Sequence, residues 1–226
     1  MTGLIGSWGF DEGSGQVLSD VSGTGHDGFL GTTSGVDAVD PQWVTTPGQV
    51  CSGSGLVFDG TNDIVTVPGP SQAGLVAWSV SFSMYATGAG GGSLARIVSK
   101  EDGPQPDFSI HFRAIDNAVA INMLNTGNTV FTAYGGAVVL GQRANWVLTY
   151  DDAGDRRVHI YQNGSEVTYL RQDTLTGTMM ATTNSWEIGD QAGNIRAFAG
   201  TLDAVRIYER VLSATEIAAL SALCPP

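Results

Sequence analysis

The stretch FAGTLDAVRIYERVLSATEIAAL (residues 198–220) contains the clearest local signals in this chain. Its first half has the alternation of a strand, and its second half has the pattern of a helix. Ser213 stands at an N-cap position and Glu216 follows three residues later, which is the pattern of a capping box. Leu212 and Ile217 occupy the positions of a hydrophobic staple. We therefore expect one short C-terminal helix whose Ile217 side packs against a sheet.

Upstream of this helix, apolar and polar residues alternate in many short segments, which is the pattern of half-buried strands. Examples are WSVSFSMYA (78–86) and ANWVLTYDD (144–152). In RVHIYQNGSEVTYL (157–170), Asn163 and Gly164 are the favoured pair for a tight hairpin turn. Such segments recur about a dozen times between glycine-rich turns. The pattern predicts an all-β fold, a two-sheet antiparallel sandwich with one short C-terminal helix, and not a parallel α/β fold.

Length and composition indicate a single domain. The chain has 226 residues, of which 42% are hydrophobic, and this is enough for a sizeable core. The glycine-rich segment 88–93 is too short to separate domains, and the longest loop candidate is 31–49. We expect one domain over residues 1–226. No run approaches the roughly 18 apolar residues that a membrane-spanning helix needs, so no membrane span is predicted.

Acidic residues dominate the chain and are unevenly placed. The chain has 22 acidic and 10 basic residues, which gives a formal net charge of −12. No lysine or arginine precedes Arg96, and the same segment holds these carboxylates: Asp11, Glu12, Asp20, Asp27, Asp37, Asp40, Asp59 and Asp63. If they converge, arginines from later strands, water or a cation must relieve their repulsion; the alternative is that they are dispersed in solvated loops. The composition argues against a nucleic-acid partner, which requires a basic surface.

The two cysteines, Cys51 and Cys224, permit two interpretations. A disulfide between them would close a long loop and contribute roughly 4–5 kcal/mol in the chain-entropy model. Two unpaired buried thiols are the alternative. Neither cysteine has a Cys or His neighbour at metal-ligand spacing, so no zinc site is expected.

Seven segments, taken in order, resemble a known family. They are GSWGFDEGSG, DVSGTGHDGFL, LVFDGTNDIVTVP, WSVSFSMYA, NWVLTYDDAGDRRVHIYQNGSEV, WEIGDQAG and the stretch quoted first. They extend from about Leu4 to Leu220, and the chain is similar to a laminin-G-like jelly-roll domain of the concanavalin A-like lectin/glucanase superfamily. The resemblance implies two curved antiparallel sheets in which the N-terminal strand lies near the C-terminal strand. It also implies a binding role, because many members bind calcium, carbohydrate or protein partners.

The superfamily also contains enzymes, but their catalytic patterns are missing from this sequence. The β-glucanase-like members share a Glu-x-Asp-x-x-Glu strand, which places its acids on one face for glycoside hydrolysis. The nearest approach here runs from Glu187 to Asp190 and has the wrong offset. The patterns of the related alginate lyases are also missing, and Lys100 is the only lysine. No histidine has a readable Ser or Cys partner, so we expect no enzymatic activity.

Two acidic stretches are candidates for calcium, which takes six to eight oxygen ligands from carboxylates, carbonyls, amides and water. The first contains Asp20 and Asp27 around a glycine-bearing turn. The resemblance implies that the closing strand brings Asp203 beside them. We therefore predict one structural calcium held by Asp20, Asp27 and Asp203 with backbone carbonyls. The alternative is that Asp20 and Asp27 bond to their own backbone in Asx turns.

The second acidic stretch is Asp59, Asn62 and Asp63, between two apolar segments. A catalytic role is disfavoured because no partner acids stand at the required spacing. The stretch has the composition of a turn that joins two core strands, in which Gly60 supplies backbone freedom and the polar side chains bond to nearby amides. A metal-binding role for Asp59, Asn62 and Asp63 is the second interpretation.

Carbohydrate binding requires aromatic platforms and polar groups that converge on one edge or face. The candidate platforms are Trp43, Tyr85 and Tyr134, and the candidate hydrogen-bonding groups are Arg113 and Asn122. Trp43 is the best candidate for exposure because it lies in the long loop. For each residue the alternative is packing in the core or between strands. The remaining tryptophans are assigned to the core or its margins.

We expect a non-catalytic, lectin-like binding module that recognises a polysaccharide or glycoconjugate, with calcium ordering its loops. The rival prediction is a structural or adhesion protein, such as a phage virion decoration or fibre component that docks onto a capsid, tail or other scaffold protein. A polysaccharide-degrading enzyme of the same superfamily is a lesser alternative. The N-terminus lacks a basic segment followed by an apolar one, so no signal peptide is expected. The predicted location is extracellular or on a virion surface, after synthesis in the cytoplasm.

Overall fold

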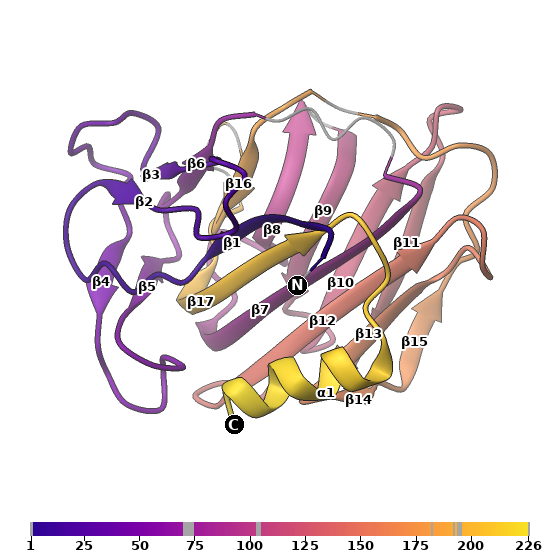
Figure 1. Ribbon diagram of the computed structural model, residues 1–226. Coiled ribbons are helices and arrows are strands. Elements are labelled where there is room, and N and C mark those ends of the chain that lie inside the picture. The colour runs from indigo at the N-terminus through magenta and orange to yellow at the C-terminus, as the bar shows by residue number, and fades with distance from the viewer. Residues whose placement is uncertain are drawn as a thin grey trace.

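The computed structural model describes residues 2–69, 75–102, 105–181, 183–191, 193 and 196–225. Within these residues the chain forms two antiparallel sheets and one short helix (Figure 1). Sheet A has eight strands, namely β14 (Ser165–Glu166), β13 (Val158–Gln162), β12 (Arg143–Asp151), β7 (Ala77–Gly88), β17 (Ala199–Tyr208), β5 (Gly55–Asp59) and β4 (Gln42–Val44) in that order, with β1 (Leu4–Trp8) also paired to β17. Sheet B has nine strands, in the order β15 (Tyr169–Gln172), β11 (Val130–Gly135), β10 (Ala118–Leu124), β9 (Gln105–Arg113), β8 (Leu94–Asp102), β16 (Trp186–Ile188), β6 (Val65–Val67), β3 (Gly28–Leu30) and β2 (Val17–Leu18).

This architecture confirms the predicted jelly-roll sandwich of two antiparallel sheets. The first and last strands are neighbours, as the resemblance implied: Leu4 lies opposite Tyr208 and Trp8 lies opposite Val205. Sheet A therefore contains both the first and the last strand of the described residues. The middle of the chain supplies the strands of sheet B that lie farthest from those ends.

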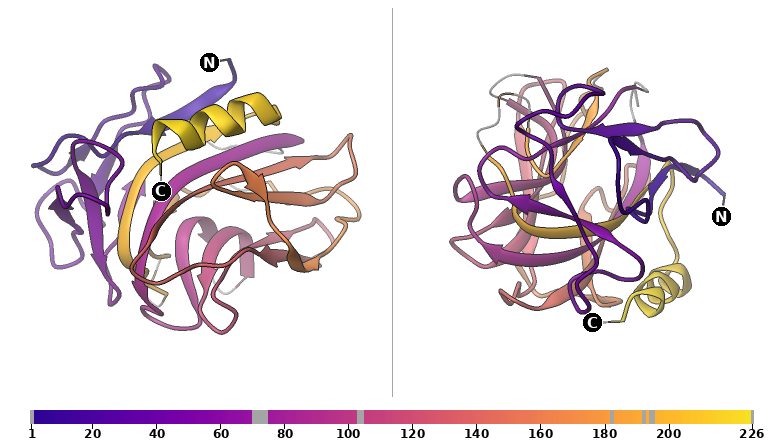
Figure 2. Two further views of the ribbon diagram at one scale, coloured as in Figure 1. Left: turned by 90° about the horizontal axis from the view of Figure 1, so that it is seen from below. Right: turned by 90° about the vertical axis from the view of Figure 1, so that its left-hand side faces the viewer.

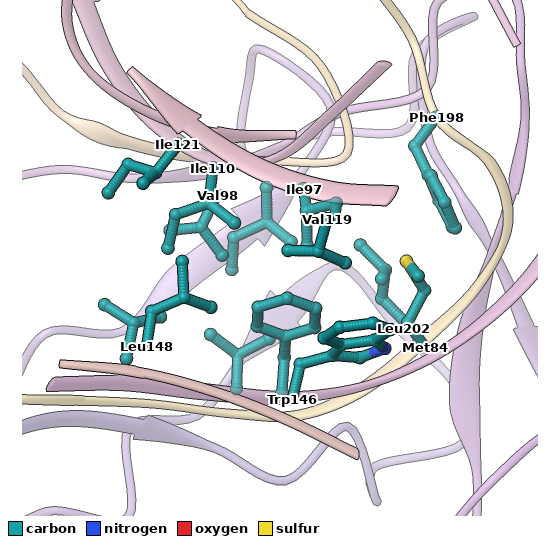
Figure 3. Close-up of a cluster of buried hydrophobic side chains, with 14 of the residues drawn as sticks. Met84, Ile97, Val98, Ile110, Val119, Ile121, Trp146, Leu148, Phe198 and Leu202 are labelled. Atoms are coloured by element: carbon teal, nitrogen blue, oxygen red, sulfur yellow. The ribbon is translucent and has the colours of Figure 1, made fainter. Parts of the chain in front are cut away.

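The hydrophobic core fills the space between the two sheets. In β12 the alternate residues Trp146, Leu148 and Tyr150 are at most 1% exposed. Figure 3 shows Trp146 and Leu148 rising from sheet A toward Ile110 and Ile121 of sheet B. Because strand residues alternate between faces, the intervening residues of each strand are directed to the outer faces of the sandwich. The outer faces are therefore where polar side chains can serve a function.

The helix α1 (Ala214–Leu223) covers part of the outer face of sheet A. It begins after Ser213, whose hydroxyl accepts the Glu216 N–H in the predicted capping box. Ile217 packs with Val147 and Tyr208, which project from the outer face of sheet A. Figure 2 shows α1 on one side of the sandwich and sheet B on the other. None of the described residues forms a helix long and apolar enough to cross a membrane.

A disulfide ties the end of α1 back to the sandwich. Cys51 and Cys224 are bonded, their Cα atoms are 4.9 Å apart, and 173 positions separate them along the chain. The bond joins the segment between β4 and β5 to the residue that ends the helix. The structure thus selects the disulfide from the two alternatives that the sequence left open.

Candidate functional site

The outer face of sheet B brings together three of the predicted carbohydrate-binding residues. Arg113 lies at the end of β9, Asn122 in β10 and Tyr134 in β11, which are adjacent strands. The guanidinium carbon of Arg113 lies 4.8 Å from the centroid of the Tyr134 ring, within cation–π range. The Thr132 hydroxyl donates to Asn122 Oδ1 over 3.0 Å. All four side chains are half-buried, so they are held in place and still reach the surface.

The register of the strands explains this gathering. Tyr134 lies opposite Ala120 in β10, and Ala120 lies opposite His111 in β9. On the other side of Tyr134, its partner is Arg171 of β15. Tyr134, Ala120 and His111 thus form one row across the face, with the small side chain of Ala120 in the middle. We call the residues Arg113, Asn122, Thr132, Tyr134 and Arg171 the sheet B face.

Three arginines act on His111 at this face, although the chain as a whole is strongly acidic. His111 and Arg96 lie opposite each other, and each is 1% exposed. Burial, and then the charges of Arg96, Arg196 and Arg113, lower the pKa of His111 to about 3. The imidazole is therefore neutral at ordinary pH, and it can donate or accept a hydrogen bond without carrying charge.

The other two predicted platforms lie on sheet A, away from the sheet B face. Tyr85 is half-buried on the outer face, opposite Arg143 and Thr201. Trp43 lies in strand β4, where it pairs with Leu56 and packs against the core. Its indole N–H donates to the Gly15 carbonyl over 3.0 Å. Trp43 is half-buried, and residues 42–44 form an edge strand where the sequence indicated a loop.

The first acidic stretch is satisfied by the protein's own donors. The Asp20 side chain is fully buried. Its carboxylate accepts hydrogen bonds from the backbone N–H groups of Ser7, Ser22 and His26 and from the hydroxyls of Ser22 and Thr24. Burial opposes ionisation, yet the bonds from Ser22, His26 and Ser7 hold the pKa of Asp20 well below its usual range. Five N–H and O–H donors thus converge on this one carboxylate.

The structure joins Asp20 to Asp27 but not to Asp203. The Asp27 carboxylate accepts the Asp20 N–H over 2.8 Å. Asp203 instead accepts the Cys51 N–H over 2.6 Å, on the outer face of sheet A. The backbone of Trp8 in β1 pairs with both Asp20 and Val205, so the first strand does lie beside the last one. Asp203, however, is separated from this region by a bulge in β17. Among the described residues no three His, Cys, Asp or Glu side chains are placed to hold a metal ion, so the three-carboxylate site is not assembled.

The second acidic stretch forms a turn. Asp59 Oδ1 accepts the Thr61 N–H over 2.7 Å and the Asn62 N–H over 3.4 Å. Asp63 Oδ2 accepts the Asp59 N–H over 2.7 Å. Gly60 has a φ of 80°, which a residue with a Cβ adopts only with strain. These bonds match the turn interpretation of the sequence.

Two further carboxylates face this turn. Asp37 and Asp40 line a cavity of about 390 Å³ together with Asp59 and Asp63. Asp63 is 6% exposed. Burial first, and then the charges of Asp59, Asp40 and Asp190, raise the pKa of Asp63 to about 6. Sequence reasoning missed Asp37 and Asp40 because they lie in a long loop whose path no local pattern indicates.

The Asp63→Asn variant is expected to be more stable than the wild type at about pH 8 in chelator, by about 1–2 kcal/mol. The folded chain holds the Asp63 proton up to a pKa of about 6, above the unfolded value of 3.8, so folding stability falls as the pH rises between these values. Asparagine removes the buried charge and keeps an oxygen to accept the Asp59 N–H. Urea unfolding of both proteins at several pH values measures the effect.

The gain should vanish below about pH 4, where both states of the wild type are protonated. The exposed Glu209→Gln variant is the charge-matched control and should change little. A variant at position 63 that is less stable than the wild type at every pH would contradict the assignment.

Comparison with known proteins agrees with this fold. A family model described as the concanavalin A-like lectin/glucanases superfamily matches residues 59–218. By sequence the chain matches none of the curated proteins. Among solved structures, the binding domain of Paraclostridial Mosquitocidal Protein 1 is similar with a TM-score of 0.72 and 14% identity, covering 97% of this chain and 52% of that one.

Two other solved structures show the same fold. Domain 4 of AbnA, an extracellular GH43 arabinanase from Geobacillus stearothermophilus solved with arabinotriose, has a TM-score of 0.63 and 18% identity, covering 96% of this chain and 98% of that domain. The sialidase of Trypanosoma rangeli, solved with a difluorosialic acid, has a TM-score of 0.67 and 16% identity, covering 98% of this chain. The chain spans about half of the mosquitocidal binding domain and 33% of the sialidase. At these identities the likeness shows the fold alone.

Proposed function

Since the chain belongs to the concanavalin A-like lectin/glucanase superfamily, we propose that it is a binding module that recognises carbohydrate without cleaving it. The proposed site is the sheet B face, and the observation that carries the proposal is the pairing of Tyr134 with Arg113 beside Asn122 and Thr132. An aromatic ring can pack against the C–H groups of a sugar, and planar amide and guanidinium groups can bond to its hydroxyls. Small-molecule sites commonly combine such apolar surfaces with a few placed polar groups.

The charges on the sheet B face favour binding over hydrolysis. A glycosidase needs a carboxyl group whose pKa is raised, so that it can act as an acid. Asp173 lies next to this face, and the bond from Arg171 lowers the pKa of Asp173. Asp116 is ion-paired with Arg113. Burial does not keep the Asp173 carboxyl protonated, and each of the two carboxylates is paired with an arginine of this face.

The solved relatives support a carbohydrate ligand. The arabinanase domain was solved with arabinotriose, and the sialidase with sialic acid or a derivative of it. The mosquitocidal protein and the botulinum neurotoxin of serotype G contribute domains described as binding domains. These ligands belong to those proteins. For this chain they favour a glycan and leave its identity to experiment.

Tyr134→Ala and Arg113→Gln variants are expected to bind an immobilised glycan about 10-fold to 100-fold more weakly than the wild type. Each variant removes one of the two stacked groups, and the loss of one contact of this kind costs about 1–3 kcal/mol. The measurement is a glycan array to find the ligand class, followed by titration with the free oligosaccharide.

Tyr85→Ala is the matched control, because Tyr85 is also a half-buried tyrosine but lies on the opposite sheet. Its binding should equal that of the wild type. Equal losses for the Tyr85 and Tyr134 variants would move the site away from the sheet B face. A folded sample that binds no glycan would overturn the proposal and favour the rival prediction of a structural or adhesion protein, and release of reducing ends would show an enzyme.

We also propose that calcium binds at the acidic cavity of Asp37, Asp40, Asp59 and Asp63 and orders its loops. The support is chemical: four carboxylates line one cavity, and Asp63 is buried among them. Carboxylate oxygens are the ligands that calcium prefers. Because no ready-made three-ligand group exists among the described residues, the loop of Asp37 and Asp40 must close onto the ion.

Added calcium should raise the melting temperature of the wild type but not of Asp63→Asn. An unchanged melting temperature in excess chelator counts against the site.

A further inference from the structure

A cavity of about 210 Å³ lies between the outer face of sheet A and the C-terminal end of α1. Strands β17, β7 and β12 form its base, and Leu220 and Leu223 of the helix form one wall. The Cys51–Cys224 disulfide closes one side. Leu223 is 67% exposed, so its side chain offers apolar surface at the mouth of the cavity. This cavity is on the opposite side of the sandwich from the sheet B face.

The base of the cavity is a row of buried polar side chains. Asp203, Ser83 and Asn145 lie opposite one another on β17, β7 and β12, and they are 2%, 2% and 7% exposed. Ser81, in the next row, is 4% exposed. Its hydroxyl oxygen is buried and has no hydrogen-bond partner. A buried hydroxyl without a partner costs free energy, and a hydrogen-bonding group placed in the cavity would remove that cost.

The backbone beside this row is also unusual. A bulge interrupts the pairing of β17 with β7 between Asp203 and Arg206. Within it Ala204 has a φ of 53°, in the left-handed region that residues with a Cβ rarely adopt. Bulges and strained residues concentrate next to functional sites, where they direct a side chain. Here the bulge keeps Asp203 at the cavity and places it against the Cys51 N–H.

The charges around the cavity nearly cancel. Asp11, Asp203 and Arg206 line it, and Arg143 contacts the disulfide at its edge. Burial, and then the charge of Asp11, raise the pKa of Asp203 to about 6. The Asp203 carboxylate accepts the backbone N–H groups of Cys51 and Ala204, which leaves some of its lone pairs for a ligand. A ligand that offers hydroxyl groups would donate to them, whereas a free anion or cation would disturb the balance.

From this combination of a buried polar row, an unpartnered Ser81 hydroxyl and a charge-balanced cavity, we infer a second binding site that takes a single neutral sugar ring. Pockets that bind drug-sized ligands measure about 300–1,000 Å³, so this smaller cavity suits one ring. Hydroxyls of the ring bond to Asp203, Ser81 and Asn145, and its apolar edge packs on Leu223. The site is independent of the sheet B face.

Ser81→Ala is the decisive variant, because it separates a ligand role from a structural one. Removing an unpartnered buried hydroxyl should leave the melting temperature unchanged or higher. Affinity for a free monosaccharide should fall about 10-fold, as it should in Asp203→Asn. The probes are neutral monosaccharides such as glucose, galactose, mannose, xylose and arabinose, measured by saturation-transfer NMR and titration on the intact, oxidised protein.

Tyr134→Ala is the control that distinguishes this site from the sheet B face. It should keep monosaccharide binding at the cavity while it loses binding on the glycan array. Loss of monosaccharide binding in Tyr134→Ala alone would assign all sugar binding to the sheet B face and overturn the inference. So would a folded wild type to which no neutral monosaccharide binds, since the cavity would then hold only water.

Discussion

Asp20→Ala is expected to lower the free energy of unfolding by about 3–5 kcal/mol, even in excess chelator. The carboxylate is buried and accepts three backbone N–H groups and two hydroxyls. Alanine would remove the shared acceptor of all five donors, and the backbone N–H group of Ser7 lies in a part of the strand that is buried. These bonds tie β1 to the loop that leads into β3, so their loss should loosen the N-terminal part of the sandwich. Urea or guanidinium unfolding, with and without calcium, measures the change.

Two comparisons make this prediction sharp. Asp27→Ala removes the acceptor of one N–H group, that of Asp20, and should cost only about 1 kcal/mol. The pKa of Asp20 is lower in the folded than in the unfolded chain, so its contribution is present above about pH 4 and is lost as the pH falls further. The difference between wild type and Asp20→Ala should therefore shrink in acid. If the loss appeared only in calcium buffer, Asp20 would be a metal ligand after all.

Replacing both Cys51 and Cys224 by serine is expected to cost about 5 kcal/mol. The disulfide spans 173 positions, and in the chain-entropy model a loop of this length restricts the unfolded chain strongly. The bond also holds the end of α1 against sheet A, where Ile217 and Leu220 are buried. Guanidinium unfolding of the oxidised wild type and the double variant gives the difference directly.

Reducing agent supplies the internal control for the disulfide. It should lower the stability of the wild type toward that of the double variant and leave the variant unchanged. A loss below about 1 kcal/mol would mean that the reduced, unfolded chain is already compact, so that the bond restricts it little.

The sandwich and its helix were predictable because their signals are local. Alternation in the strand segments follows from burial on one face, and the capping box at Ser213 and Glu216 needs only four residues. The order of strands within each sheet is a different matter, because pairing joins segments that are far apart in the chain. The resemblance implied only one part of this order, the closeness of the N-terminal and C-terminal strands, which the pairing of β1 with β17 confirms.

The candidate site was predictable only in part. Arg113, Asn122 and Tyr134 share a face because of strand register, which single segments do not reveal. Asp203 was misplaced because a bulge moves it out of the regular register of β17. The hydrogen bonds that satisfy Asp20 come from residues up to 13 positions away, and no pattern of acidic residues distinguishes them from calcium ligands.

β1 pairs with β17, and α1 follows on the same side of the sandwich. This arrangement determines which face of the protein is exposed when either terminus is coupled to a support. Figure 2 shows both elements on the side away from the outer strands of sheet B. A biosensor chip, bead or fusion tag coupled through either terminus would therefore sit against sheet A and display the sheet B face to the solution in a uniform orientation. The cavity under α1 would face the support, so surface-based assays should report chiefly on the sheet B face, and experiments in free solution are needed to see both.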